Sequence, residues 1–554
     1  MERILLYFVC CLLSVPLMAQ SLTRIPGQDS ESGLPLANNA TTDGEDITEL
    51  APVRILCIGN SYSRDMVESW LPSFAKTSNI QLVVGNVTRA GYGLRHHWQN
   101  LEEGRAVLEY CKLKDGIYTS SDGHTLAEII RDEPWDYVTF QQNSEDSGLY
   151  STYTPFLRNL IDYVKDIHPE AKLGWVMTWA YAQDFDGSGF QNYQNDQAVM
   201  YYSIRNAVRQ MLADYPEIEF VVPCGTAVQN LRSSFLGDRV NRDGTHLNTF
   251  IGRYLTAYTF FATMFGEETA IGNSYMPYYM NDFTMRVIRG AALDAVRNPF
   301  AVTPQVYPDY VGDNSIIPND IKINFTAERK EPPGWNNLGL HHNFLAGLKD
   351  ADGKDPGIFI FSNAEFSGEA YNGPTETSTT MDMPNAVSIT QLYGYSEGNI
   401  SGVPQKLKAV IQFHHLNKTL AYDFSFFASQ KDVTDNRETQ FMLAGADTLV
   451  TTIDASGNRN GVVSLYGMRT DDDGAITLTV SAGPNNNNPY RFYQLNALRI
   501  SAYDPNDPNS LTPVYNIDNS NKYAKFIRNG HLYIIKDGRT YSPDGKRIEQ
   551  QTYK

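Results

Sequence analysis

Between residues 52 and 295, short apolar runs alternate with helical patterns, and this alternation constrains the fold more than any other feature. Continuous apolar strands separated by amphipathic helices are typical of a parallel sheet covered by helices on both faces. The interval 94–134 is less regular, with helix-like pieces and a Gly/Ser/Asp turn. The sequence therefore predicts a three-layer α/β/α domain, flavodoxin-like, with a parallel sheet. The five expected strands cover 53–58, 80–84, 136–140, 173–178 and 219–222.

The periodicity changes to strand-like alternation beyond about residue 320, and 554 residues exceed what one core accommodates. We predict an α/β domain over 52–298, a Pro-punctuated linker over 299–319 and a jelly-roll-like β-sandwich over 320–502. The sandwich either binds carbohydrate or serves as a structural companion. Residues 503–554 are predicted to form a tail with one hairpin and a role in sorting. Strand-like runs in the sandwich include 409–413, 422–426 and 476–480.

The N-terminus has the pattern of a secretory signal peptide. Met1–Ala19 combines a short charged start, an apolar run and small or apolar residues before Gln20. We expect export to the periplasm, the cell surface or the extracellular space, with a flexible leader over 20–51. Later runs fall short of the roughly 20 apolar residues that a membrane-spanning helix needs. The mature chain would keep three cysteines, too few for a disulfide framework: Cys57, Cys111 and Cys224.

Charge and histidine spacing argue against several ligand classes. The formal charge is −18, whereas nucleic acid binding needs a basic surface. Adjacent histidines in a strand point to opposite faces, and no spaced Cys or carboxylate completes a metal-ligand set beside them. We therefore expect no nucleic acid, no metal and no organic cofactor. The histidine pairs considered are His96-His97, His341-His342 and His414-His415.

Chemistry-bearing residues follow four of the predicted strands. In an open parallel sheet, ligands bind outside the carboxyl ends of the strands. A hydroxyl nucleophile needs a base, an acid that orients the base, and donors aimed at the developing oxyanion. All of these residue types occur at the expected edge. They are Ser61, Gly91, Gln141, Asn143, Asp243 and His246.

Each of these motifs also has a simpler structural interpretation. Gly59-Asn60-Ser61 can be an ordinary helix N-cap that follows a strand. Asp243 and His246 can belong to an Asx-turn with an exposed imidazole, and Gly91 can serve a turn that needs positive φ. Their joint occurrence, in chain order and at strand ends, favours a catalytic set.

The motifs resemble those of the SGNH (GDSL-like) hydrolase superfamily, and within it secreted Bacteroidetes-type members with a β-sandwich module. The resemblance covers about 52–265. It implies a triad in which Ser61 is the nucleophile and Asp243 and His246 come from one loop. It also implies that no cofactor is needed.

The same resemblance implies an oxyanion hole formed by the N–H groups of Ser61 and Gly91 and the side-chain amide of Asn143. Two motifs depart from the superfamily pattern. The first is Gly-Asn-Ser instead of Gly-Asp-Ser, which retains the serine. The third is Gln-Gln-Asn-Ser instead of Gly-x-Asn-Asp. Gln141 is therefore a competitor for the role of Asn143.

The sequence suggests a substrate as well. Trp179 and Tyr181 follow the fourth predicted strand, and we expect them to flank a bound sugar. The resulting hypothesis is a secreted serine esterase, similar to carbohydrate O-acetylesterases, that removes acyl groups, acetyl above all, from a glycan or another small ester. The alternative is a non-catalytic glycan-binding surface protein on a degenerate SGNH fold. The altered third motif favours this alternative, and the intact Ser61, Asp243 and His246 favour the enzyme.

Overall fold

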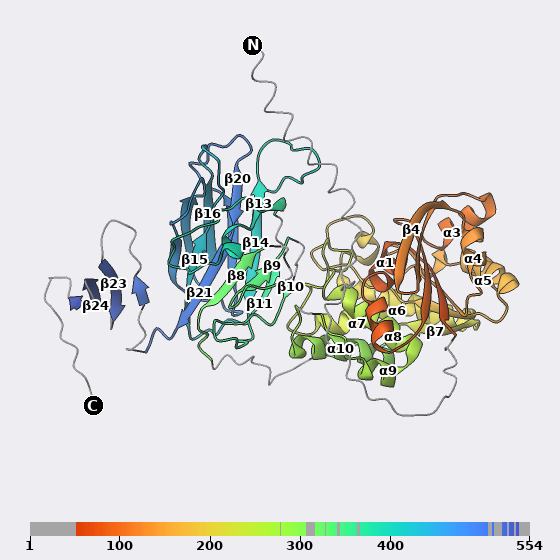
Figure 1. Cartoon of the computed structure of the whole chain (residues 1–554). Coiled ribbons are helices and arrows are strands. Elements are labelled where there is room, and N and C mark those ends of the chain that lie inside the picture. Colours follow the sequence, from red (N-terminus) through yellow and green to blue (C-terminus); the bar gives the residue numbers. More distant parts are fainter. Residues whose placement is uncertain are drawn as a thin grey trace, which may run out of the picture. The chain divides into compact units, whose positions relative to one another are not determined.

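The computed structural model describes residues 51–305 and 316–507 except 278, 327, 329, 341–343 and 363–365, and the backbone of four short strands between 512 and 541. The chain divides into two compact units (Figure 1). The first comprises Met1–Tyr278 and Asp282–Tyr307, and the second Tyr279–Asn281 and Pro308–Lys554. The predicted signal peptide and the leader up to residue 50 lie outside the described residues. Within the described part of the chain, no helix is long and apolar enough to cross a membrane.

The first unit is built on a seven-stranded sheet in the order β4-β3-β2-β1-β5-β6-β7. The strands β2, β1, β5, β6 and β7 are parallel, and their order is that of flavodoxin-like doubly wound folds. The predicted α/β fold class is therefore confirmed. The five parallel strands are β1 (Val53–Ile58), β2 (Leu82–Thr88), β5 (Tyr137–Phe140), β6 (Lys172–Val176) and β7 (Ile218–Val222).

Two antiparallel strands extend this sheet beyond the five that the sequence predicts. β3 (Leu108–Lys114) pairs with β2, and β4 (Ile117–His124) pairs with β3 at the edge of the sheet. Most side chains of β4 are exposed. An edge strand that faces water needs no run of apolar residues. This is why the Gly/Ser/Asp segment within 94–134 was predicted as a turn.

Helices cover both faces of the sheet, as the arrangement in Figure 1 shows. Their apolar residues recur at helical spacing, as in α5, which buries Leu157, Leu160, Ile161 and Val164. One layer holds α1 (Ser61–Val67), α2 (Leu71–Thr77), α7 (Cys224–Arg232), α8 (Gly252–Phe265) and α10 (Asp282–Arg297), linked through α7 and α8. The other contains α3 (Leu94–Glu103), α4 (Leu126–Asp132) and α5 (Phe156–Ile167). The unit also contains α6 (Gln197–Asp214) and α9 (Glu267–Gly272).

The described start of the predicted linker belongs to the first unit. Two side chains on α7 bind the backbone of this segment. The hydroxyl of Thr226 donates to the carbonyl of Pro299 at 2.6 Å, and Asn230 accepts from the N–H of Thr303 at 2.7 Å. The predicted boundary at 298 therefore lies several residues too early. The described part of the segment after it pairs with no strand, and side chains of the first unit bind its backbone N–H and C=O groups. Residues 306–315 of that linker lie outside the described part.

The second unit is rich in antiparallel strands. A six-stranded sheet has the order β10-β11-β14-β19-β16-β17, a five-stranded sheet β18-β15-β21-β8-β9, and a small sheet β12-β13-β20. The three predicted strands correspond to β14 (Lys408–His414), β15 (Ala421–Phe427) and β19 (Ile476–Ala482). Further elements are β8 (Ile321–Phe325), β9 (Asn336–Leu338), β10 (Phe344–Leu345), β11 (Phe359–Ser362), β12 (Gly368–Ala370), α11 (Asn385–Ser388), β13 (Gln391–Tyr395), β16 (Glu438–Ala444), β17 (Thr448–Asp454), β18 (Val463–Met468), β20 (Phe492–Leu495) and β21 (Ala497–Tyr503).

Aromatic side chains hold the two larger sheets together. Phe426 of the five-stranded sheet stacks on Phe441 of the six-stranded sheet, with ring centroids 4.4 Å apart. Phe424 packs edge-on against Phe413 at 5.5 Å. These alternate residues of β15 point to one face, as the period of a strand requires. The more specific assignment of a jelly-roll sandwich stays a prediction.

Within the predicted tail, the described backbone forms a four-stranded antiparallel sheet. β24 pairs with β25, with Lys536 opposite Arg539, which agrees with the predicted hairpin. A role in sorting stays a prediction. The strands are β22 (Thr512–Val514), β23 (Tyr523–Arg528), β24 (His531–Lys536) and β25 (Arg539–Tyr541).

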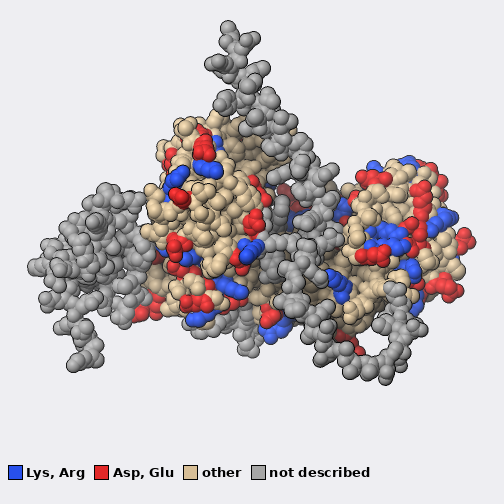
Figure 2. Space-filling model, in the orientation of Figure 1, with Lys and Arg blue, Asp and Glu red and all other residues tan. Residues whose placement is uncertain are grey.

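Acidic residues outnumber basic ones in this chain. The sequence has 63 Asp and Glu against 45 Lys and Arg. On the face shown in Figure 2, side chains of both signs are interspersed on each unit. Interspersed charges keep a surface well solvated and give weak long-range steering. The charge distribution on this face therefore points to recognition by local contacts.

A buried carboxylate in the second unit is only half satisfied. Asp423 on β15 is 4% exposed, and one of its oxygens accepts from the N–H of Gly467 at 2.8 Å. Its Oδ2 is buried and has no hydrogen-bond partner among the described residues. Burial raises the pKa of Asp423 to about 6, although the charge of Arg499 opposes the shift.

We expect Asp423→Asn to stabilise the protein at neutral pH. Because the folded state holds this proton more tightly than the unfolded state, where the pKa is about 3.9, the free energy of unfolding should fall as pH rises from about 4 to 6. The uncharged amide should remove that dependence and raise Tm at pH 7.5. Calorimetry from pH 4 to 8 measures both effects. A lower Tm for the variant at pH 7.5 would contradict this account.

Candidate active site

A tight connection between β1 and α1 places Ser61 at the carboxyl end of the sheet. Ser61 is the first residue of α1, and Asn60 caps the helix by accepting from the N–H of Tyr62 at 2.8 Å. Gly59 precedes the cap where there is no room for a larger residue. A Cβ at this position would lie 2.6 Å from the hydroxyl of Ser63. The hydroxyl of Ser61 is thus held at a fixed position at the carboxyl end of β1.

The loop before α8 brings an imidazole and a carboxylate to Ser61. His246 Nε2 lies 2.8 Å from Ser61 Oγ, although the two residues are 185 positions apart. His246 Nδ1 lies 2.9 Å from Asp243 Oδ2. The side chain of His246 is 27% exposed and that of Asp243 is 47% exposed, so this hydrogen-bonded chain lies open to solvent. The structure thus brings together the three residues of the predicted triad.

The carboxylate of Asp243 is held by its own loop. Asp243 Oδ1 accepts from the N–H of His246 at 2.7 Å, from the N–H of Thr245 at 3.1 Å and from the hydroxyl of Thr245 at 3.0 Å. Burial acts to raise the pKa of Asp243, but these donors and the neighbouring imidazole lower it below its usual value. Thr245 was not among the predicted site residues. A hydroxyl two residues after an aspartate is the signal of such a turn.

Gly91 lies in the turn between β2 and α3. Its φ is +71°, a conformation that favours glycine, and the space where a Cβ would point is open. The backbone of this turn is tied to the first motif, because Asn60 Nδ2 donates to the carbonyl of Tyr92 at 2.8 Å. Asn60 therefore joins two strand ends. The sequence analysis treated this residue only as a helix cap.

The structure distinguishes between Gln141 and Asn143. Gln141 Nε2 donates to Asn60 Oδ1 at 2.9 Å, so its amide is engaged in holding the helix cap. Asn143 accepts from the N–H of Asp146 at 3.2 Å, while its Nδ2 makes no hydrogen bond within the described part of the chain. Asn143 therefore has both N–H groups of its amide available, whereas the orientation of the Gln141 amide is fixed by its bond to Asn60.

The expectation that Trp179 and Tyr181 flank a sugar is wrong. Their exposed fractions are 0% and 3%, because the chain after β6 turns back into the core. Trp179 stacks on Tyr62 at 4.1 Å and donates its indole N–H to the carbonyl of Thr245 at 2.8 Å. Tyr181 donates to the hydroxyl of Ser144 at 2.9 Å. Trp179 thus braces the loop that carries His246.

A buried carboxylate on α1 also anchors this loop. Asp65 has no exposed surface and lies 2.7 Å from a guanidinium nitrogen of Arg253 and 3.1 Å from one of Arg242. Its Oδ2 accepts from the N–H of Leu247 at 2.8 Å. Asp65 lies one helical turn after Ser61. The helix that bears the hydroxyl is therefore tied to the segment that bears the imidazole.

Among the described residues, no group of three or more Cys, His, Asp or Glu side chains could hold a metal ion. The three cysteines of the predicted mature chain are free and buried. Burial raises the pKa of Cys57 to about 12, so its thiol stays protonated near neutral pH.

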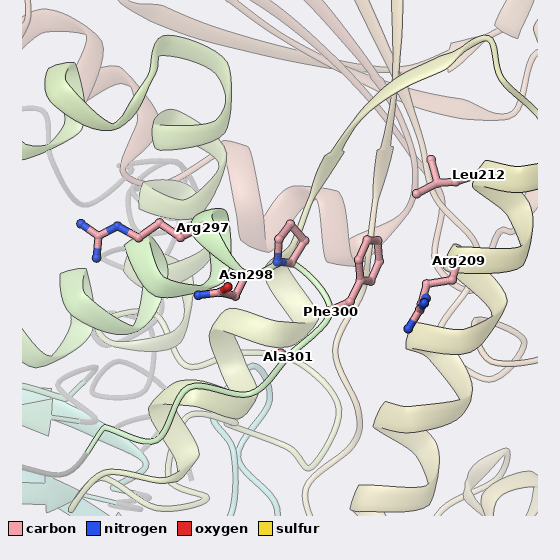
Figure 3. Close-up of a pocket in the computed structure, with 7 residues that line it drawn as sticks. Arg209, Leu212, Arg297, Asn298, Phe300 and Ala301 are labelled. Carbon is pink, nitrogen blue, oxygen red and sulfur yellow. The ribbon is translucent and has the colours of Figure 1, made fainter.

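A separate cavity of about 600 Å³ lies between the end of α6 and the segment after α10 (Figure 3). Its walls come from α6, from the last residue of α10 and from the residues that follow α10. It contains none of the predicted site residues. It is lined by Arg209, Leu212, Arg297, Asn298, Pro299, Phe300 and Ala301.

Comparison with known proteins identifies the family. The profile of a family described as a domain of unknown function, DUF4886, matches residues 54–295. A crystal structure of a DUF4886 family protein from Bacteroides uniformis is 36% identical, with a TM-score of 0.44, and the match covers 46% of this chain and 98% of that chain. The chain belongs to the DUF4886 family. No curated protein matches it significantly.

Solved structures of other proteins are similar to this DUF4886 domain at low identity. An acetylxylan esterase from Geobacillus stearothermophilus is 13% identical, with a TM-score of 0.27, over 40% of this chain and 98% of that chain. A member of the lipolytic protein G-D-S-L family from Veillonella parvula is 16% identical, with a TM-score of 0.23, over 37% and 94%.

We expect Asp65→Asn to destabilise the DUF4886 domain by about 3 kcal/mol. Removing one partner of a buried ion pair typically costs about 3–5 kcal/mol, and the two arginines here keep some contact with water. Urea unfolding followed by tryptophan fluorescence reports on this domain, which contains five of the six tryptophans. Asp162→Asn, which breaks an exposed pair with Arg158, is the matched control and should be near neutral. A change below about 0.5 kcal/mol for Asp65→Asn would show that this carboxylate is dispensable.

Proposed function

We propose that this protein is an exported serine esterase that removes acyl groups, acetyl in the first place, from a glycan. The observation that carries the proposal is the hydrogen-bonded chain from Ser61 through His246 to Asp243, with distances of 2.8 and 2.9 Å. An oriented imidazole beside a hydroxyl is the arrangement that turns a weak nucleophile into a reactive one.

In the proposed reaction, Ser61 Oγ attacks the ester carbonyl while His246 Nε2 accepts the hydroxyl proton. Asp243 accepts from Nδ1–H, which keeps the imidazole in the tautomer that leaves Nε2 free and stabilises the imidazolium. Collapse of the tetrahedral intermediate breaks the bond to the leaving alcohol, which receives the proton from His246. Water then hydrolyses the acyl-serine by the same steps.

The negative charge of the intermediate needs donors that are already in place. The N–H groups of Ser61 and Gly91 and the amide of Asn143 come from three strand ends at one edge of the sheet. Asn143 Nδ2 has no competing acceptor among the described residues. Such preorganised donors act without further reorganisation, so they lower the barrier efficiently.

The substrate class and the location are inferred from features outside the triad. Export is inferred from the signal-like pattern of Met1–Ala19. The glycan is inferred from that location and from the strand-rich second unit, which is an argument by association. The aromatic pair expected beside the sugar is buried and no longer contributes.

Replacing the nucleophile tests the proposal. We expect Ser61→Ala to lower kcat for 4-nitrophenyl acetate by at least about 10³-fold with little change in Tm, because only one half-buried hydroxyl is lost. Ser120→Ala, on the exposed strand β4, is the control and should keep full activity. A fluorophosphonate should label wild-type Ser61, detected by mass spectrometry of the peptide.

Three outcomes would contradict parts of the proposal. Turnover by Ser61→Ala near the wild-type rate would refute the role of Ser61 as the nucleophile. A wild-type protein that is inert toward all esters would favour the binding protein considered as the alternative. Hydrolysis of the aryl ester without release of acetate from any acetylated polysaccharide would refute the proposal that a glycan is the substrate.

The oxyanion donor is tested by Asn143→Asp. This substitution keeps the acceptor for the N–H of Asp146 but replaces the donor with a negative charge. We expect kcat to fall by about 10²–10³-fold or more with little change in KM, since loss of one such donor has that effect. Asn206→Asp on the exposed face of α6 should leave kcat unchanged. Wild-type turnover by Asn143→Asp would exclude this amide from the oxyanion hole.

A further inference from the structure

His97 is a buried histidine with one well-defined hydrogen bond. It lies on α3, is 1% exposed, and its Nε2 is 2.8 Å from the carbonyl oxygen of Gly59. A carbonyl can only accept, so Nε2 carries the proton. Nδ1 is buried and has no hydrogen-bond partner among the described residues. The contact therefore needs a proton on Nε2, and the surroundings of Nδ1 favour the neutral ring.

The accepting carbonyl belongs to the peptide that leads into the nucleophile helix. The N–H of Gly59 donates to the carbonyl of Val87 at 3.1 Å, so β2 holds one side of this residue. His97 holds the other side from α3. The carbonyl of Gly59 and the N–H of Asn60 share one planar peptide. The orientation of this peptide sets the backbone conformation that leads into Ser61.

The ring of His97 also touches the second strand end. It packs edge-on against the ring of Tyr92 at 5.7 Å, and Tyr92 follows Gly91 directly. The carbonyl of Tyr92 is bound by Asn60. His97 thus contacts Tyr92, which follows Gly91, and Gly59, which lies two residues before Ser61.

We infer that His97 is a positioning residue that sets the orientation of the Ser61 and Gly91 N–H groups toward the oxyanion. This role rests on the proposed esterase function. It differs from that of the triad, because His97 touches neither Ser61 Oγ nor the site of the substrate carbonyl. Its contribution is to the geometry of the transition-state contacts, so its loss reduces kcat and leaves KM almost unchanged.

The environment keeps this histidine neutral. Burial lowers the pKa of His97 to about 4, and the neighbouring His96 acts in the same direction, while the bond to Gly59 opposes the shift. A second proton on Nδ1 would find no acceptor there. The donor to Gly59 is therefore present throughout the pH range in which an imidazole base functions.

Two substitutions separate the hydrogen bond from the volume of the ring. His97→Leu fills similar space and leaves the Gly59 carbonyl unpaired, whereas His97→Gln offers an amide donor at similar reach. The full chain is assayed with 4-nitrophenyl acetate. We expect His97→Leu to lower kcat roughly 10- to 100-fold while KM changes by less than about twofold. We expect His97→Gln to recover most of the lost kcat. Unchanged kcat for Leu, or no recovery by Gln, would overturn the inference.

A second histidine provides a matched control for stability. His168 follows α5 and its Nε2 lies 2.6 Å from the carbonyl of Ile130, near the opposite edge of the sheet. His168→Leu should lower Tm without changing kcat. If His168→Leu and His97→Leu reduced kcat equally, loss of stability would explain both effects and the positioning role would be refuted.

Failure of the proposed function would be recognised separately. If the wild-type protein has no esterase activity, that function fails while the state of His97 can still be measured. In NMR spectra of the full chain with ¹⁵N-labelled histidine, His97→Gln identifies the signal. The geometry requires the Nε2–H tautomer and no titration above about pH 5. A signal of the Nδ1–H tautomer would refute the contact with Gly59, because Nε2 would then have no proton to donate.

Discussion

The geometry of the site depends on one buried carboxylate, Asp65. It lies one turn into the helix that begins with Ser61, and it binds two arginines and a backbone N–H of the segment that carries His246. A buried charge must be fully paired to be tolerated. Asp65 obtains these partners because the distant segment packs against α1. That docking also brings the imidazole within 2.8 Å of Ser61 Oγ.

Further contacts restrict the same two segments. The indole of Trp179 binds the carbonyl of Thr245 and stacks on Tyr62, so one side chain touches both the loop and the start of the helix. Tyr62 in turn lies edge-on to the ring of His246 at 5.7 Å. Side chains with locked rotamers hold reacting groups more precisely than a free loop does. This explains why large buried aromatics surround an exposed reaction centre.

The sequence predicted much of this arrangement, for reasons that differ between residues. Five parallel strands were recognised because a sheet covered on both faces leaves continuous apolar runs in the sequence. Ser61 and His246 were placed together because the carboxyl ends of parallel strands meet at one edge. The exposed strand β4 was missed, since an edge strand facing water leaves no such run. Trp179 was misassigned because a residue just past a strand end can turn inward as well as outward.

The sequence by itself determined the order of elements in the first unit, the edge of the sheet at which the candidate site lies and the residue types gathered there. These follow from local periodicity and from the rule that places strand ends together. Only the tertiary structure decided that the amide of Asn143 is available and that of Gln141 is engaged, because both lie in the same short run after β5. Gln141 binds Asn60 from a different strand end, whereas Asn143 accepts a hydrogen bond from its own loop. Distances between such segments depend on packing and on the pairing of buried charges, which no local pattern records.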